Sequence, residues 1–165
     1  KNLERKPHAL SVCNVFKKRS SFLGYNLWRY ISNKTPCVVY GHGNKDMKLG
    51  IRETKNLEEL INIYNTSALY LNTTLHSAMP RARCEAAMCG TPIISTDNYG
   101  ISKYFEHNKS AILSNDKDKL VKSVKKMIKS KSMQEDFGNE ARAVAIKHFN
   151  LKDNLKRWDD LYKQV

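Results

Sequence analysis

The chain has 165 residues, of which 41% are hydrophobic and 27% are charged, a composition typical of globular proteins that bury a core of their own. No run of about 18 apolar residues occurs, which excludes a membrane-spanning helix. The net charge is +13, with +9 on residues 1–55 and +5 on residues 116–165. Basic ends attract phosphates, nucleic acid or anionic lipid, although a solvated lysine-rich surface accounts for most of these lysines equally well.

The beginning of the chain, residues 1–7, lacks the apolar core of a signal peptide, and its first residue is not Met. We therefore expect a fragment or processed product of a longer protein with an upstream half. No two cysteines form a C-x-x-C pair, and each lies beside apolar residues. This favours buried free thiols over disulfides or a metal site and indicates a reducing, cytoplasmic location. The cysteines are Cys13, Cys37, Cys84 and Cys89.

Strand and helix patterns alternate along the first half of the chain. The predicted elements are a strand over 8–13, a helix over about 20–32, a strand over 37–40, a short strand near 49–52 and a helix that starts after Asn56. Asn56 and Glu59 have the spacing of a capping box. Apolar residues at helical spacing predict one buried face on this helix, made by Leu57, Leu60, Ile61 and Tyr64.

The second half continues the alternation. A strand over 68–72 precedes a loop, a helix with a proline near its start and Gly90 just past its end, and a strand over 92–95. A short helix over 100–105, a last strand over 111–113 and helices over 117–129, 133–148 and 152–163 follow. This order predicts an α/β fold, a doubly wound parallel sheet with helices on both faces, forming a single domain over 1–165.

The helix within this pattern carries a specific resemblance. Residues 85–94 read E-A-A-M-C-G-T-P-I-I. They resemble the E-A-M-A-C-G-T-P-V-V signature of family 4 glycosyltransferases, which lies in the C-terminal, donor-binding half of the GT-B fold. The resemblance extends over about residues 8–165. It implies a Rossmann-like domain that binds a nucleotide-diphosphate sugar and, with an acceptor-binding half absent from this chain, transfers a hexose with retention of configuration and without a metal ion or other cofactor.

The resemblance also assigns the two ends of the central loop. The family carries two glutamates eight positions apart, and Glu85 matches the second, which binds the ribose hydroxyls. Ser77 stands at the first position, near the transferred sugar, and His76 beside it offers a substitute polar contact. Arg81 and the backbone N–H groups of residues 81–83 start the helix, where a diphosphate would bind.

Three cations, Lys17, Lys18 and Arg19, follow the first strand, where they would stabilise the charge of a departing diphosphate. A basic helix start is also common without function. The family places G-R here and a Lys about five residues later. Asn14 occupies the Arg position, and one of the three cations occupies the Lys position.

Two further segments resemble donor-contacting parts of the family. Gly41 and Gly43 match a G-x-G after the second strand, where backbone can approach a ligand closely. Arg52, with Glu53, falls in a segment whose backbone contacts the donor base.

The terminal helix over 151–165, with Trp158 and Tyr162, resembles the helix that crosses to the missing N-terminal domain. Packing of its rings on this same domain is an equal alternative.

Two other functions remain open. The absence of the first glutamate and of the arginine favours a catalytically degenerate binding or assembly module. The charge suggests a nucleic-acid-binding or DNA-modifying domain, which ranks last because no recognition motif is present. The expected partners are a nucleotide-sugar donor, a glycan, lipid or protein acceptor held by the missing half, and peripherally an anionic membrane. An isolated half is expected to transfer little sugar, because transfer needs both substrates in line.

Overall fold

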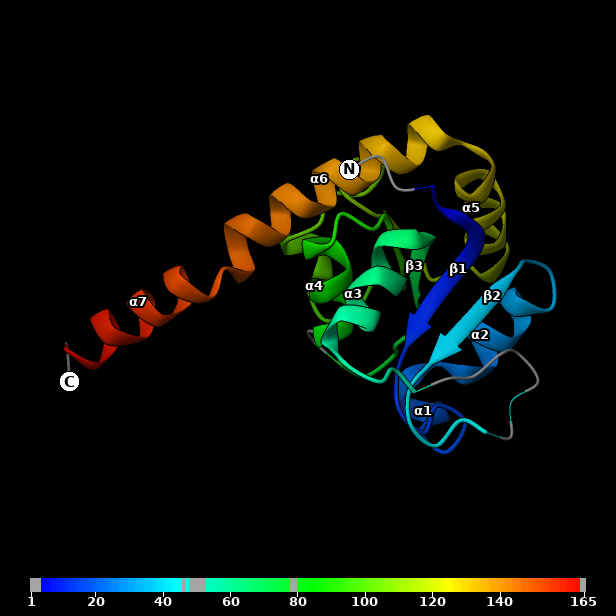
Figure 1. Ribbon diagram of the computed structural model, residues 1–165, viewed down its shortest axis with the longest axis horizontal. Helices are drawn as coiled ribbons and strands as arrows, with labels where there is room; N and C mark the ends of the chain where they lie inside the picture. The colour runs from blue at the N-terminus through cyan, green and yellow to red at the C-terminus, as the bar shows by residue number, and fades with distance from the viewer. Residues whose placement is uncertain (1–3, 46, 48–52, 78–79, 164–165) are drawn as a thin grey trace.

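In the computed structural model, which describes residues 4–45, 47, 53–77 and 80–163, a parallel sheet has the strand order β2-β1-β3-β4-β5 (Figure 1). Every neighbouring pair is parallel. The chain moves outward from β1 to β2 and then crosses back to β3, so the direction of winding reverses between β1 and β3. This confirms the predicted doubly wound parallel sheet. The strands are β1 (Lys6–Val12), β2 (Cys37–Tyr40), β3 (Ser67–Asn72), β4 (Ile93–Ser95) and β5 (Ile112–Leu113).

Helices cover both faces of this sheet, because alternate strand residues point to opposite sides. Leu69 and Leu71 pack with Trp28 of α2 on one face, whereas Tyr70 packs on the other face with the helices α3, α4 and α6. Both clusters are almost fully buried. The helices are α1 (Ser20–Leu23), α2 (Tyr25–Ser32), α3 (Leu57–Thr66), α4 (Arg81–Met88), the 3-10 helix η1 (Ile101–Lys103), α5 (Lys117–Lys129), α6 (Lys131–Phe149) and α7 (Leu151–Tyr162).

The helix predicted over about 20–32 is broken in two at Gly24. This glycine has φ +70, and a Cβ atom there would lie 1.9 Å from the carbonyl oxygen of Thr73. The chain therefore passes against the end of β3 at a position that admits only glycine. The prediction of one continuous helix is therefore wrong, because this close approach forces α1 to end and α2 to start in a new direction.

The helix α3 begins as predicted, since the Asn56 side chain accepts a hydrogen bond from the backbone N–H of Glu59 at 2.9 Å. Its buried face differs from the prediction. Leu57 and Ile61 are 69% and 41% exposed, and the face that meets the core is made by Leu60, Ile63 and Tyr64. The short strand predicted near 49–52 lies outside the described residues.

The lysine-rich side of α5 is solvated, as predicted, while Leu120 and Val124 are fully buried. Of the cysteines, all four of which are free, Cys37 is buried and the other three are half-buried. Among the described helices, none is both long and apolar enough to cross a membrane.

The terminal helix α7 continues from the end of α6 and points away from the sheet (Figure 1). None of its described residues is buried. Trp158 and Tyr162 stack on each other with ring centroids 6.0 Å apart and are 56% and 72% exposed. The sequence left open whether these rings pack on this same domain or contact another one. Their exposure shows that they do not pack on this domain, so that alternative is wrong.

Candidate functional site

Four loops meet at the carboxyl edge of the sheet, after β1, β2, β3 and β4. In open parallel sheets, ligands bind outside the carboxyl ends of the strands, where the winding reverses. Here that point lies between β1 and β3. The loops after β1, β2 and β3 lie at this edge of the sheet and carry Asn14, Gly41, Gly43, His76 and Ser77.

The loops after β1 and β2 are hydrogen-bonded to each other. The Asn14 side-chain oxygen accepts from the backbone N–H of His42 at 2.8 Å, and the N–H of Val15 donates to the carbonyl of His42 at 2.7 Å. The Asn44 side chain bonds the N–H of Phe16 and the carbonyl of Cys13. Asn14, which the resemblance aligns with an arginine, therefore holds the neighbouring loop in place.

The two glycines of the G-x-G segment are required by this contact between loops. A Cβ atom on Gly41 would lie 2.1 Å from the carbonyl oxygen of Cys13, and one on Gly43 would lie 2.6 Å from Cγ1 of Val15. Both glycines have positive φ, +138 and +73. The close approach that the sequence suggested is thus made to the β1 loop. Val15 itself has φ +48, a strained conformation for a β-branched residue.

The predicted phosphate-side cations follow this loop. Lys17, Lys18 and Arg19 are exposed, and Arg19 immediately precedes α1. Burial raises the pKa of the Cys13 thiol to about 12, and the positive charge of Arg19 opposes this shift, which places Arg19 near the end of β1. Arg52 lies outside the described residues, while Glu53 is described and its Oε1 lies 2.8 Å from Nδ1 of His42.

Glu85 lies on the exposed side of α4. Its carboxylate is held by Tyr64, which the sequence predicts only as part of the buried face of α3. The hydroxyl of Tyr64, a side chain 1% exposed, donates to Oε2 of Glu85 at 2.9 Å. Burial, with the nearby Tyr70 and Glu85, raises the pKa of Tyr64 far above its usual value, so its hydroxyl stays a donor. A buried tyrosine hydroxyl requires a partner, which was the available signal for this contact.

The two arginines at the start of α4 have different environments. Arg81 is exposed at the first helical position, after Pro80. Arg83 is fully buried, and its Nη1 donates to the hydroxyl of Ser95 at 3.3 Å. The backbone N–H of Arg83 donates to the carbonyl of Pro80, so the expectation of an N–H group free for a phosphate at that residue is wrong. Arg81 therefore carries a solvent-facing positive charge at the start of α4.

The His76 side chain is tied to the loop after β4. Its Nδ1 lies 2.9 Å from the hydroxyl oxygen of Tyr99. Ser77, the next residue, is half-buried. The sequence predicts no partner for His76, because Tyr99 lies 23 residues away along the chain and only the parallel sheet brings the two residues together.

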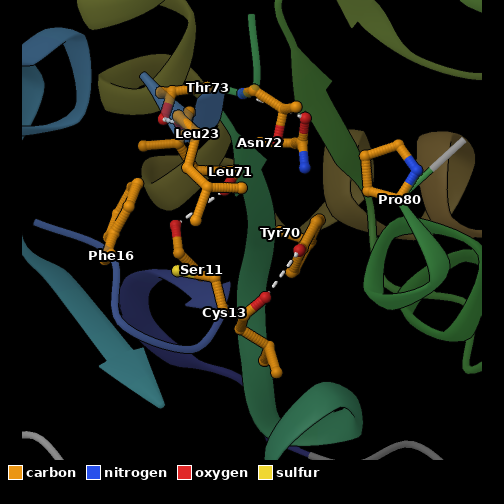
Figure 2. Close-up of a pocket in the computed structure, with 11 residues that line it drawn as sticks. Ser11, Cys13, Phe16, Leu23, Tyr70, Leu71, Asn72, Thr73 and Pro80 are labelled. Carbon is orange, nitrogen blue, oxygen red and sulfur yellow. Dashed lines mark hydrogen bonds between the residues drawn. The ribbon is translucent and has the colours of Figure 1, made fainter. Parts of the chain in front are cut away.

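A small cavity of about 50 Å³ lies beneath this edge, between β1 and β3 (Figure 2). Its lining is mainly apolar and includes Cys13, Phe16 and Tyr70. Such a volume holds a few water molecules at most and is too small for a nucleotide. Among the described residues, no three His, Cys, Asp or Glu side chains gather closely enough to hold a metal ion.

Three solved structures illustrate the fold. TarM from S. aureus has a TM-score of 0.80 and 15% identity, over 98% of this chain and 36% of TarM. The pneumococcal O-GlcNAc transferase GtfA has a TM-score of 0.72 and 14% identity, over 99% of this chain and 37% of GtfA. HepE from Anabaena has a TM-score of 0.78 and 13% identity, over 96% of this chain and 49% of HepE. The chain thus spans less than half the length of each.

At these identities the likeness shows the fold alone, which is that of GT-B glycosyltransferases. No curated protein sequence matches the chain. The family model described as "Glycosyl transferases group 1" matches residues 26–144, which include β2, β3, β4 and the loop and helix that carry Ser77 and Glu85. This match covers well over half of the sequence, and the chain therefore belongs to the group 1 glycosyl transferases.

Proposed function

We propose that this chain is the donor-binding, C-terminal half of a family 4 glycosyltransferase, with residues 1–165 forming one domain. It binds a nucleoside-diphosphate hexose, and an acceptor-binding half outside this chain completes the enzyme. The carboxylate of Glu85, held in place by the hydroxyl of Tyr64, is the observation that carries the proposal. Structural neighbours support it, because HepE was solved with UDP-glucose and GtfA with UDP and GlcNAc.

In this proposal each charged group acts on a different part of the donor. The second carboxylate oxygen of Glu85 accepts charge-assisted hydrogen bonds from the ribose hydroxyls. Arg81 and one or more of the cations at 17–19 face the diphosphate. The bond from the anomeric carbon to the diphosphate oxygen breaks, and that oxygen keeps the electron pair. Cations fixed there stabilise the growing negative charge without a metal ion.

Retention of configuration requires the acceptor oxygen to bond the anomeric carbon on the face from which the diphosphate departs. The acceptor proton passes to the departing phosphate oxygen, so charge and atoms balance. Ser77 carries no charge, and the acceptor-binding half supplies the remaining contacts to the sugar. The isolated chain is therefore expected to bind donor and to transfer sugar slowly.

The exposed apolar side of α7 is proposed to contact the acceptor-binding half. Leu151, Leu155, Trp158 and Tyr162 follow one another at spacings of four, three and four residues, and each is at least 55% exposed. This spacing places them on one face of the helix. The acceptor itself is a glycan, lipid or protein bound by that half.

Isothermal titration with UDP, GDP and ADP tests the proposal. At least one of the three should bind, and Glu85→Ala should weaken that binding at least tenfold. Glu140→Ala, which removes an exposed glutamate from α6, is the matched control and should leave affinity unchanged. Failure of all three nucleotides to bind would refute the proposal.

A second candidate, a catalytically degenerate binding module, is favoured by one observation. Asn14 accepts the hydrogen bond from His42 instead of offering a cation, and Ser77 offers no carboxylate. Replacing both, Ser77→Glu with Asn14→Arg, should raise donor hydrolysis in a weakened enzyme. Hydrolysis should stay at background in a binding module, provided that thermal unfolding shows the variant to be folded.

A further inference from the structure

Three aromatic rings from three separate segments line up at the carboxyl edge. Phe22 comes from α1, His76 from the loop after β3, and Tyr99 from the loop after β4. The ring centroids lie 6.0 Å apart between Phe22 and His76 and 6.2 Å apart between His76 and Tyr99, both in edge-to-face orientation. Phe22 is 53% and Tyr99 57% exposed. We call these three side chains the ring cluster.

The backbone beneath the ring cluster is fixed by hydrogen bonds between the segments. The N–H groups of Leu75 and His76 both donate to the carbonyl of Phe22, at 2.8 and 3.2 Å. The Asn98 side-chain amide donates to the carbonyls of Thr74 and Leu75. The backbone segments that carry the three rings are therefore held together before any ligand arrives, which lowers the entropy cost of binding.

The conformation of Tyr99 is strained. Its φ is +45, a region that bulky residues adopt at a cost of roughly 1–3 kcal/mol. The residue is also 57% exposed, so burial does not compensate for the strain. Strain of this kind is common at ligand sites, where a side chain must point in a particular direction. Here it directs the Tyr99 hydroxyl to Nδ1 of His76.

The chemistry of the ring cluster fits a sugar ring. A pyranose has faces of C–H groups and a rim of hydroxyls, and aromatic faces beside polar atoms match both parts. The tyrosine hydroxyl and the imidazole supply those polar atoms. His76 directly precedes Ser77, the position that the family resemblance places near the transferred sugar.

We propose that the ring cluster binds the pyranose ring of the transferred hexose, through Phe22 and Tyr99, in place of a carboxylate at position 77. This inference rests on the proposed donor function. A nucleobase would also stack on aromatic rings. In that case Phe22→Ala and Tyr99→Asn would lower the affinity for the nucleotide itself, and not only the part of the affinity that the sugar adds.

The test compares a nucleoside diphosphate with its glucose ester by isothermal titration, using whichever of UDP, GDP and ADP binds best. Phe22→Ala and Tyr99→Asn remove the rings, and asparagine tolerates the positive φ of position 99. Both variants should keep nucleotide affinity within twofold. Each should lose about 3- to 10-fold of the extra affinity that glucose adds, as expected for an aromatic contact. Ile146→Ala, which removes an exposed apolar side chain from α6, is the control and should change neither affinity.

Nuclear magnetic resonance of the ring protons provides a readout independent of the nucleotide. Methyl glycosides of glucose, GlcNAc, mannose and galactose should shift the Phe22 and Tyr99 resonances and leave those of Tyr162 unmoved. If the nucleotide binds and both variants keep the full sugar increment, the ring cluster proposal is wrong while the donor site stands. If no nucleotide binds, the donor function fails, and the glycoside titration alone decides: no shift with any glycoside refutes the ring cluster.

Discussion

Tyr64→Phe removes a single oxygen atom, the one that holds Glu85. The tyrosine is 1% exposed and the phenylalanine ring fills the same space, so the perturbation is confined to the hydrogen bond at 2.9 Å. A hydrogen bond to a charged group contributes roughly 1.5–3 kcal/mol. Glu85 is exposed, so water replaces part of this interaction, and about 1 kcal/mol is the appropriate magnitude. That corresponds to a fall in nucleotide affinity of about fivefold.

The loss arises because the free carboxylate must be ordered when the ribose binds. Immobilising such a side chain costs about 0.5–1.5 kcal/mol, and the tyrosine hydroxyl removes much of that cost in the native chain. Titration with UDP and with 2′-deoxy-UDP separates this effect from general damage. The native chain should prefer the nucleotide that has both hydroxyls, and Tyr64→Phe should narrow that preference.

A double-mutant cycle with Glu85→Gln completes the assay. If Tyr64 acts through Glu85, its substitution should have little further effect once the carboxylate is gone. Tyr70→Phe is the matched control, since Tyr70 is equally buried and packs against Tyr64, but its hydroxyl donates to the carbonyl of Val12. Equal losses from Tyr64→Phe and Tyr70→Phe, or strict additivity with Glu85→Gln, would refute the positioning role.

Three further outcomes concern stability. Gly41→Ala should lower the free energy of unfolding, measured by urea titration, by at least about 1 kcal/mol, because it combines a positive φ with a clash against the carbonyl of Cys13. An unchanged urea midpoint would contradict the close contact between the loops after β1 and β2. Burial raises the thiol pKa of Cys13 to about 12 and that of Cys37 to about 11. The free energy of unfolding should therefore fall as the pH rises from about 9 toward 12, because the thiols of the unfolded chain lose their protons first. In Cys13→Ser the free energy of unfolding should fall less over this pH range. Trp158→Ala should change stability by less than about 0.5 kcal/mol, and a larger loss in thermal unfolding would mean that α7 packs on the domain.

Much of the fold was predictable because its signals are local. The helix α5 occupies the predicted residues 117–129, where the apolar spacing, an Asp116 cap and a lysine-rich outer face all agree. The break at Gly24 was not predictable, because it depends on the carbonyl of Thr73, 49 residues away. The same holds for the buried face of α3, which is decided by where the helix meets β3.

The candidate site divides in the same way. Glu85 was identified from a contiguous run of residues that resembles a known signature. Its partner Tyr64 was classified as core, because a single aromatic residue at helical spacing gives no indication of what its hydroxyl bonds. The role of Asn14 was inferred from its alignment with an arginine, whereas the structure has it bond His42. Contacts between loops depend on the sheet that joins them, and no local pattern encodes them.

The joined loops after β1 and β2 also constrain how this chain can evolve. An arginine at position 14 has no side-chain acceptor for the N–H of His42, so regaining the cation means losing the hydrogen bond that holds the two loops together. Gly41 and Gly43 fit only while the β1 loop keeps its present path. Position 14 and the G-x-G segment therefore form an epistatic unit: an arginine at position 14 adds a cation but loses the loop contact, and a second change in the partner loop would recover the stability that is lost.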